Sequence, residues 1–135
     1  MKNDIIVKLN VIDGNKVIAD TQKLNDITAC FLQKLGYLAN FEIDLKLTSN
    51  SEIIKYNHKY MGKNAPTDVL SFPIFDKFEL QNISNIKNNN FLLGEIVIST
   101  EFAEKEAKEK NIPLDKTIEK LFCHGLKHLT GIHHK

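Results

Sequence analysis

The sequence contains no arginine, and all eighteen of its basic side chains are lysines. Together with seventeen acidic residues they leave a net charge of +1 at pH 7. A chain so close to neutrality is not a general polyanion binder, so any contact with a nucleic acid must come from a local patch. Without a guanidinium fork, such a patch must use lysine point charges, hydroxyls or backbone amides.

Cysteines and long apolar runs are also scarce. The two cysteines, Cys30 and Cys123, lie far apart and fit no disulfide framework, which favours a reducing, cytoplasmic location. No apolar run approaches the roughly 18 residues of a membrane span, and the first residues lack the apolar core of a signal peptide, so we expect no membrane partner. The 135 residues are enough for one globular domain, over 1–135.

Hydrophobic periodicity and capping residues divide the chain into strands and helices. Strands are predicted at 5–12, 41–48, about 69–74 and 92–99, and helices at about 21–35, 49–60, 100–111 and 114–130. Segment 76–90 is rich in asparagine and has little periodicity, which indicates an exposed loop. The order of elements predicts a single α/β (α+β) domain with a mixed sheet of about four strands.

Four of the five histidines lie near the C-terminus, in the stretch from His124 to His134. His124 and His128 are spaced i, i+4, which on a helix places both imidazoles on one face, about 6 Å apart along the axis. Gly131 can adopt the left-handed conformation that ends a helix, so that His134 can fold back beside them. Three imidazoles with an open fourth position are typical of a catalytic zinc site, and we predict one Zn²⁺ per chain.

Two other residues compete as ligands. His133 could replace His134, although only His134 keeps the spacing of known zinc sites. Cys123 adjoins His124, but adjacent helical residues point to different faces, so we expect Cys123 to face the core. The inner side of the last helix is expected to consist of Ile118, Leu121, Phe122, Gly125, Leu126 and Leu129.

The histidine spacing has a precedent in the zinc metalloprotease pattern H-E-x-x-H-x-x-G-x-x-H. The three histidines and the glycine are in register with it, but Gly125 stands where the peptidase keeps its glutamate general base. The pattern therefore predicts a similar metal geometry and argues against proteolysis.

With these motifs placed, the chain resembles the YbeY family of bacterial endoribonucleases and ribosomal RNA maturation factors. Residues 66–73 match the family's P-T-D-V-L-S-F-P, residues 93–99 match L-G-D-I-V-I-S except for Glu95, and residues 124–134 match H-G-x-L-H-L-x-G-Y-D-H in its histidines and glycines. The order and spacing of the three blocks agree, and the match covers nearly the whole chain.

The resemblance implies that His124, His128 and His134 are zinc ligands and that the substrate is RNA. It implies a single-strand-specific endoribonuclease that acts on precursor ribosomal RNA, in 16S rRNA 3′-end processing and ribosome quality control. The expected partners are therefore RNA and the ribosome or ribosome-associated proteins. The attacking group could be a zinc-bound hydroxide or the ribose 2′-hydroxyl assisted by the metal, and the sequence leaves both open.

One departure from the family pattern bears on activity. The family has an arginine directly after the tyrosine that precedes the P-T-D-V block, where mechanistic proposals give it a role at the RNA phosphate, and this chain has Met61. Methionine can neither bind phosphate nor stabilise a developing negative charge. Met61 therefore favours an alternative function, a ribosome- or RNA-binding factor with a mainly structural zinc and weak nuclease activity.

The remaining candidates are lysines and hydroxyls. RNA binding is predicted at Lys55, Lys59, Lys63 and Lys127, and assistance to the reaction at Lys63, Thr67, Ser71 and Lys127. Thr67 and Ser71 could instead form caps or turns, and Lys127 could be a solvated side chain. Glu95 and Asp68 are expected to be structural residues at strand ends, so the general base stays open.

Overall fold

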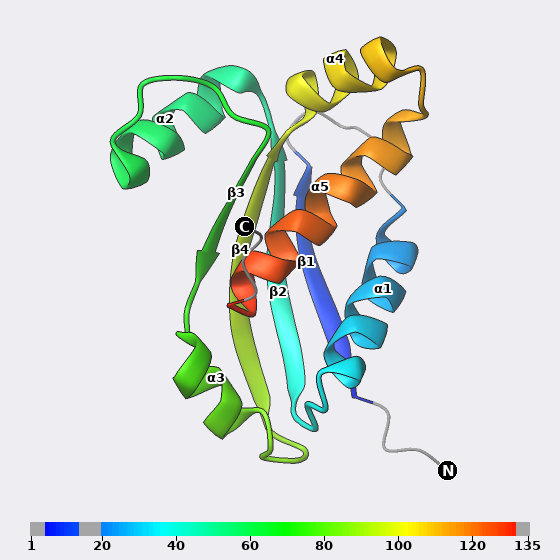
Figure 1. Cartoon of the computed structure of the whole chain (residues 1–135), viewed down its shortest axis with the longest axis vertical. Coiled ribbons are helices and arrows are strands. Elements are labelled where there is room, and N and C mark those ends of the chain that lie inside the picture. Colours follow the sequence, from blue (N-terminus) through cyan, green and yellow to red (C-terminus); the bar gives the residue numbers. More distant parts are fainter. Residues whose placement is uncertain (1–4, 14–19, 132–135) are drawn as a thin grey trace.

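The structure is a computed structural model, and it describes residues 5–13 and 20–131. Its elements are β1 (Val7–Asp13), α1 (Thr21–Lys34), β2 (Asn40–Thr48), α2 (Asn50–Met61), β3 (Val69–Pro73), α3 (Lys77–Ile83), β4 (Asn90–Ser99), α4 (Thr100–Lys110) and α5 (Leu114–Leu129). They form one small domain with a four-stranded mixed sheet and five helices, which confirms the predicted fold class (Figure 1). None of the helices within these ranges is long and apolar enough to cross a membrane.

The strands lie in the order β1-β2-β4-β3. β1, β2 and β4 run parallel to one another, whereas β3 runs antiparallel to β4 and forms one edge of the sheet. Side chains alternate along a strand, so Ile96 of β4 faces α5 while its neighbour Val97 packs against α2 on the opposite face. The edge strand β3 contacts α5, which places the helix with the two histidines beside an open sheet edge.

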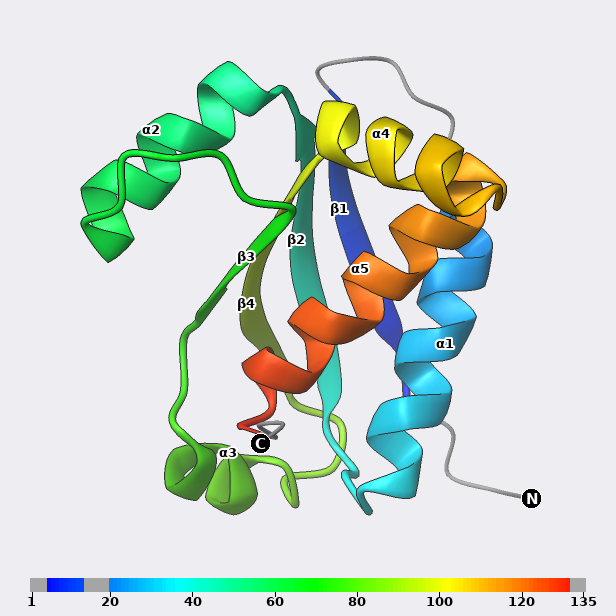
Figure 2. The same cartoon turned by 45° about the horizontal axis from the view of Figure 1, so that its top comes forward.

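Helices α1 and α5 cover one face of the sheet, as both views show (Figures 1 and 2). β2 presents alternating apolar side chains to this face, and each is at most 1% exposed: Phe41, Ile43, Leu45 and Leu47. The residues expected on the inner side of α5 are all buried: Ile118, Leu121, Phe122, Gly125, Leu126 and Leu129. Burial of one large apolar side chain contributes about 1.5–3 kcal/mol, so this layer holds α5 firmly against the sheet.

The prediction of a loop over 76–90 is wrong in part, because residues Lys77–Ile83 form α3. Asp76 caps this helix in a capping box: its side chain accepts from the Glu79 backbone N–H at 2.8 Å, and the Glu79 carboxylate accepts from the Asp76 backbone N–H at 3.0 Å. Within α3 only Leu80 is buried. Seven residues with one buried side chain show no measurable periodicity, although the D-x-x-E capping signal was available.

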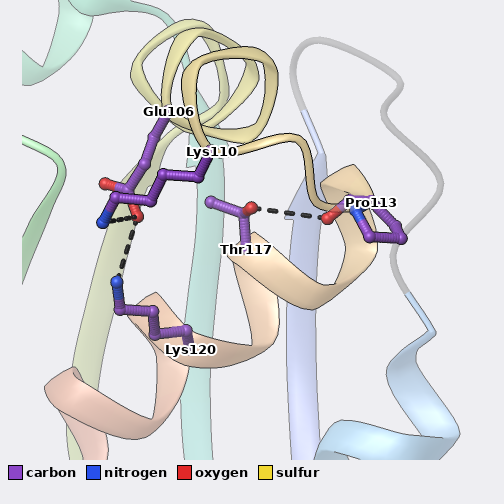
Figure 3. A network of polar contacts seen from close by, with 5 residues as sticks. All are labelled: Glu106, Lys110, Pro113, Thr117 and Lys120. Carbon is purple, nitrogen blue, oxygen red and sulfur yellow. Dashed lines mark hydrogen bonds and ion pairs between the residues drawn. The ribbon is translucent and has the colours of Figure 1, made fainter.

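A polar network ties α4 to the first half of α5 (Figure 3). The Glu106 carboxylate accepts from the Lys120 ammonium at 3.2 Å and forms an ion pair with Lys110 at 3.5 Å. The Thr117 hydroxyl donates to the Pro113 carbonyl at 3.3 Å, within the first turn of α5. Exposed ion pairs contribute little to stability, so the network orients α5 while the apolar layer beneath it supplies most of the stability.

Candidate metal centre

The imidazoles of His124 and His128 meet in the last turns of α5. Their Nε2 atoms are 3.2 Å apart, with ring centroids separated by 4.7 Å and planes inclined by 58°. His124 is exposed and His128 is half-buried. The prediction that the i, i+4 spacing places both rings on one face is therefore confirmed.

The separation of the two nitrogens fits a shared metal ion. Zn–N bonds of about 2.0–2.1 Å in a tetrahedral site place two ligand nitrogens about 3.3 Å apart. The same distance also suits a hydrogen bond between the rings, in which one Nε2 carries a proton and the other accepts it. Coordination of a metal ion would require both nitrogens to be unprotonated, and metal binding by this pair stays a prediction.

The predicted third ligand, His134, is not among the residues that the structure describes. Over 5–13 and 20–131, no group of three histidine, cysteine or acidic side chains is arranged to hold a metal. Gly131 has a φ of +78°, and its N–H donates to the His128 carbonyl at 3.1 Å, so α5 ends in the left-handed turn that was predicted. His133 and His134 lie outside the described residues, and their role as ligands stays a prediction.

Cys123, which was expected to face the core, is half-buried and is not among the fully buried residues of α5. Burial raises the pKa of its thiol, and the nearby Glu119 carboxylate raises it further. The thiolate is the form that binds metals, so a raised pKa argues against Cys123 as a ligand.

The two histidines form one wall of a cleft of about 310 Å³. The opposite wall comes from the end of α2 and from the edge strand, and the complete lining is Met61, Val69, Leu70, Ser71, Pro73, His124 and His128. Met61 is 48% exposed. The position at which the sequence departs from the motif thus lies in the same cleft as the histidines, a proximity that the sequence did not reveal.

Of the proposed assistants, only Ser71 lines this cleft. Thr67 and Asp68 form a local turn, in which the Thr67 hydroxyl donates to the Asp68 carboxylate at 3.4 Å and the Val69 N–H donates to it at 2.8 Å. These bonds favour the structural alternative for both residues. Lys63 is exposed in the loop after α2, and Lys127 is half-buried on α5, so their roles stay predictions.

Two of the four proposed RNA-binding lysines are brought together on one helix. Lys55 and Lys59 lie on α2 and line a second depression, whereas Lys63 and Lys127 are not part of its lining. The role of all four lysines in RNA binding stays a prediction.

Glu95 lies in the middle of β4, so its expected position at a strand end is wrong, while its exclusion from the site stands. It alternates with Ile96, which faces α5, and so points to the other side of the sheet from the histidines. Burial raises the pKa of the Glu95 carboxyl, and the neighbouring Asp44 carboxylate raises it further. The strand register, which places Glu95 beside Asp44, explains the second effect.

Gly125 faces the core. A Cβ atom at this position would lie 2.9 Å from Cγ2 of the fully buried Ile96. A side chain here would point into the sheet and away from the cleft, so the chain has no room for the peptidase glutamate at this helix position. The close approach of α5 to β4 depends on this missing side chain.

We expect the Gly125→Glu variant to be destabilised by about 4 kcal/mol or more, because it buries a carboxylate without a partner and overpacks the core. Guanidinium unfolding of the two proteins measures the difference. Gly125→Ala is the matched control: it adds only the methyl group and gains about 1 kcal/mol of helix propensity, so its net cost should be below 2 kcal/mol. A Glu variant as stable as the parent would contradict the packing described for α5.

Sequence reasoning overlooked Asn57, which supports the loop after α2. It is buried in α2, and its side-chain N–H donates to the Ala65 carbonyl at 2.9 Å. This bond holds the loop that leads from Met61 into β3. An asparagine four residues after the buried Ile53, on the apolar face of a helix, was the available signal.

The sequence and the fold were compared with those of known proteins. A family model described as endoribonuclease YbeY matches residues 10–135. A protein of that name from Aquifex aeolicus is 36% identical over 134 residues, which cover 99% of this chain and 79% of that protein. Proteins of the same name from Prochlorococcus marinus and Persephonella marina are 37% and 41% identical, over 88% and 71% of this chain and 61% and 58% of their own lengths.

The solved structure of the Thermotoga maritima protein TM1509 has the same fold. It superimposes with a TM-score of 0.55 at 23% sequence identity, over 96% of this chain and 75% of that one. The family model, the sequence relatives and the shared fold lead to one conclusion: the chain belongs to the endoribonuclease YbeY family.

Proposed function

We propose that this chain is a metal-dependent endoribonuclease that cleaves single-stranded RNA, with precursor ribosomal RNA on the ribosome as its substrate. The observation that carries the proposal is the convergence of the His124 and His128 Nε2 atoms, 3.2 Å apart, in an open cleft. The name of its sequence relatives supports the activity, because they are called endoribonucleases.

The proposed metal is one zinc ion, held by His124, His128 and His134. A zinc ion in such a site supplies Lewis-acid chemistry, which makes a nucleophile available at neutral pH and stabilises negative charge. The protein's own contribution is to hold two imidazoles in fixed orientation and to offer the Ser71 hydroxyl as a donor to a phosphate oxygen. No carboxylate and no cation belongs to the described lining of the cleft.

That lining also supports the alternative function. Met61 occupies the wall opposite the histidines and cannot stabilise charge on a phosphate. With this residue the chain could serve as an RNA-binding factor at the ribosome, with a mainly structural zinc and slow cleavage. The two proposals differ in rate and not in location. Both place the protein in the cytoplasm, which agrees with the two free cysteines among the described residues.

We expect the purified protein to cleave labelled single-stranded RNA, to lose this activity with a chelator, and to recover it when zinc is returned. The physical reason is that removing the metal removes the main source of charge stabilisation. Casein serves as the parallel substrate, and it should remain intact because Gly125 supplies no general base. RNA cleavage that is unchanged by the chelator would contradict the metal-dependent mechanism, and stable RNA binding without cleavage would favour the binding factor.

A further inference from the structure

A second depression lies beside the histidine cleft, between α2 and the face of the sheet that α5 does not cover. Its volume is about 240 Å³, and its lining is Lys46, Glu52, Lys55, Tyr56, Lys59 and Tyr60. Three ammonium groups and two aromatic rings therefore surround it, with one carboxylate. The lining shares no residue with the histidine cleft.

The aromatic rings form a supported platform. Tyr60 contacts Phe72 edge to face, with centroids 5.1 Å apart, and Tyr56 lies against both rings with centroids at 6.1 and 6.2 Å. Tyr60 is nevertheless 53% exposed. A large aromatic ring that is held by two others and still open to solvent is suited to stacking with a planar ligand.

The positive charges lie close to these rings. The Lys46 ammonium donates to the Tyr56 hydroxyl at 3.0 Å, which leaves the phenolic proton free to be donated in turn. The Lys59 ammonium lies 5.2 Å from the centre of the Tyr60 ring. Lys55 pairs with Glu52 at 3.6 Å, an exposed contact that an anion can readily replace.

Acidic side chains bound the depression on one side. Glu95 lies on the same face of β4 as Val97 and acts electrostatically on Lys46, while Asp44 lies two residues before Lys46 on the same face of β2. These carboxylates disfavour a phosphate over this part of the sheet, so the path of an RNA strand along α2 is the more favourable one. The arrangement therefore favours one direction of approach, along the α2 residues toward the histidines.

The second depression and the histidine cleft adjoin at Tyr60 and Met61. They are consecutive residues at the end of α2. Tyr60 lines the second depression, and Met61 lines the histidine cleft. Their Cα atoms are about 3.8 Å apart. Because the two linings meet at these residues, an RNA strand that enters the histidine cleft can continue into the depression beside Tyr60.

We propose that this depression binds one unpaired nucleotide of the RNA strand next to the cleaved phosphodiester. Its base stacks on Tyr60, and its phosphate is held by Lys46, Lys59 and the Tyr56 hydroxyl. The proposal rests on the endoribonuclease function proposed above, and it identifies what selects single-stranded substrates: a base in a duplex is already stacked and paired, and is not available to Tyr60.

The test is single-turnover cleavage of a ten-nucleotide single-stranded RNA at increasing protein concentration. We expect Tyr60→Leu to raise the half-saturating concentration about tenfold, because base stacking on an aromatic ring is a binding interaction of about that size. The loss should appear mainly in this concentration and less in the maximal rate. Tyr60→Phe keeps the ring and should restore binding.

A set of RNAs with one base removed at each position identifies the stacked nucleotide. Removal of the base at one position should weaken RNA binding by the parent protein about tenfold. The same RNA should bind to Tyr60→Leu almost as well as the intact RNA does, because that variant has already lost the stacking contact. Lys46→Gln should reduce the slope of log affinity against log salt by about 0.7, the value for one phosphate contact on a single strand. Phe78→Leu, which changes an aromatic residue of α3 that is 72% exposed, is the control and should bind RNA as the parent does.

The outcomes separate the two proposals. If the parent cleaves RNA and Tyr60→Leu has the same half-saturating concentration, the subsite is refuted while the endoribonuclease function stands. The subsite is also refuted if removing the base weakens RNA binding equally at every position, both in the parent and in Tyr60→Leu. A parent that neither binds nor cleaves RNA would overturn both proposals together. Thermal melting of each variant identifies a loss that arises from unfolding.

Discussion

We expect the His128→Ala variant to lose most of its bound metal and to slow RNA cleavage by on the order of a thousandfold. The two Nε2 atoms that converge at 3.2 Å supply two of the three protein ligands proposed for the site. Removing one leaves too few ligands for tight binding of zinc. Elemental analysis of protein purified without a tag or added metal measures the loss directly, and the cleavage assay measures its consequence.

The chain offers matched controls for this variant. His58 is exposed on α2 and lies outside the lining of the histidine cleft, so His58→Ala should keep both metal and activity. His134→Ala should behave as His128→Ala does, whereas His133→Ala should keep its metal. Metal retained by His134→Ala and lost from His133→Ala would mean that His133 is the third ligand. A parent protein that is folded and free of metal would refute the site as a whole.

The second large effect is expected at Met61, where a cation should accelerate the reaction. Met61→Arg places a guanidinium in the wall opposite the two histidines, within the same cleft of about 310 Å³. One electrostatic contact of this kind is typically worth about 3 kcal/mol in the transition state, or on the order of a hundredfold in rate. Because such help is confined to the transition state, it should appear in kcat more than in KM.

The structure indicates that the Met61→Arg substitution is compatible with the fold. Met61 is the last residue of α2 and is about half exposed, and a positive charge at a helix C-terminus interacts favourably with the helix dipole. Met61→Leu conserves the volume without the charge and should leave the rate near that of the parent.

A different outcome would point to Lys63 as the source of the charge. In that case Met61→Arg changes little and Lys63→Ala abolishes cleavage. If neither substitution alters the single-turnover rate, the loop between α2 and β3 is not part of the chemistry. The RNA-binding factor then becomes the better description of this protein.

The sequence by itself determined the features that depend on local periodicity. The i, i+4 spacing of His124 and His128 is sufficient to place both rings on one face, because a helix brings such residues together wherever it lies in the fold. The buried face of α5 and the alternation along β2 follow from the same kind of pattern. The sequence pattern does not reveal α3, because its single buried side chain, Leu80, cannot form a periodic apolar pattern.

Only the tertiary structure decided which segments meet. The cleft joins Met61 to His124 and His128 because β3 pairs antiparallel with β4 at the edge of the sheet and α5 packs across them. The position of Glu95 in β4 directs its side chain away from the histidines. The close approach of α5 to Ile96 leaves no space for a glutamate side chain at position 125. Strand pairing and helix packing join residues that are distant in the chain, and the local pattern of a sequence does not contain that information.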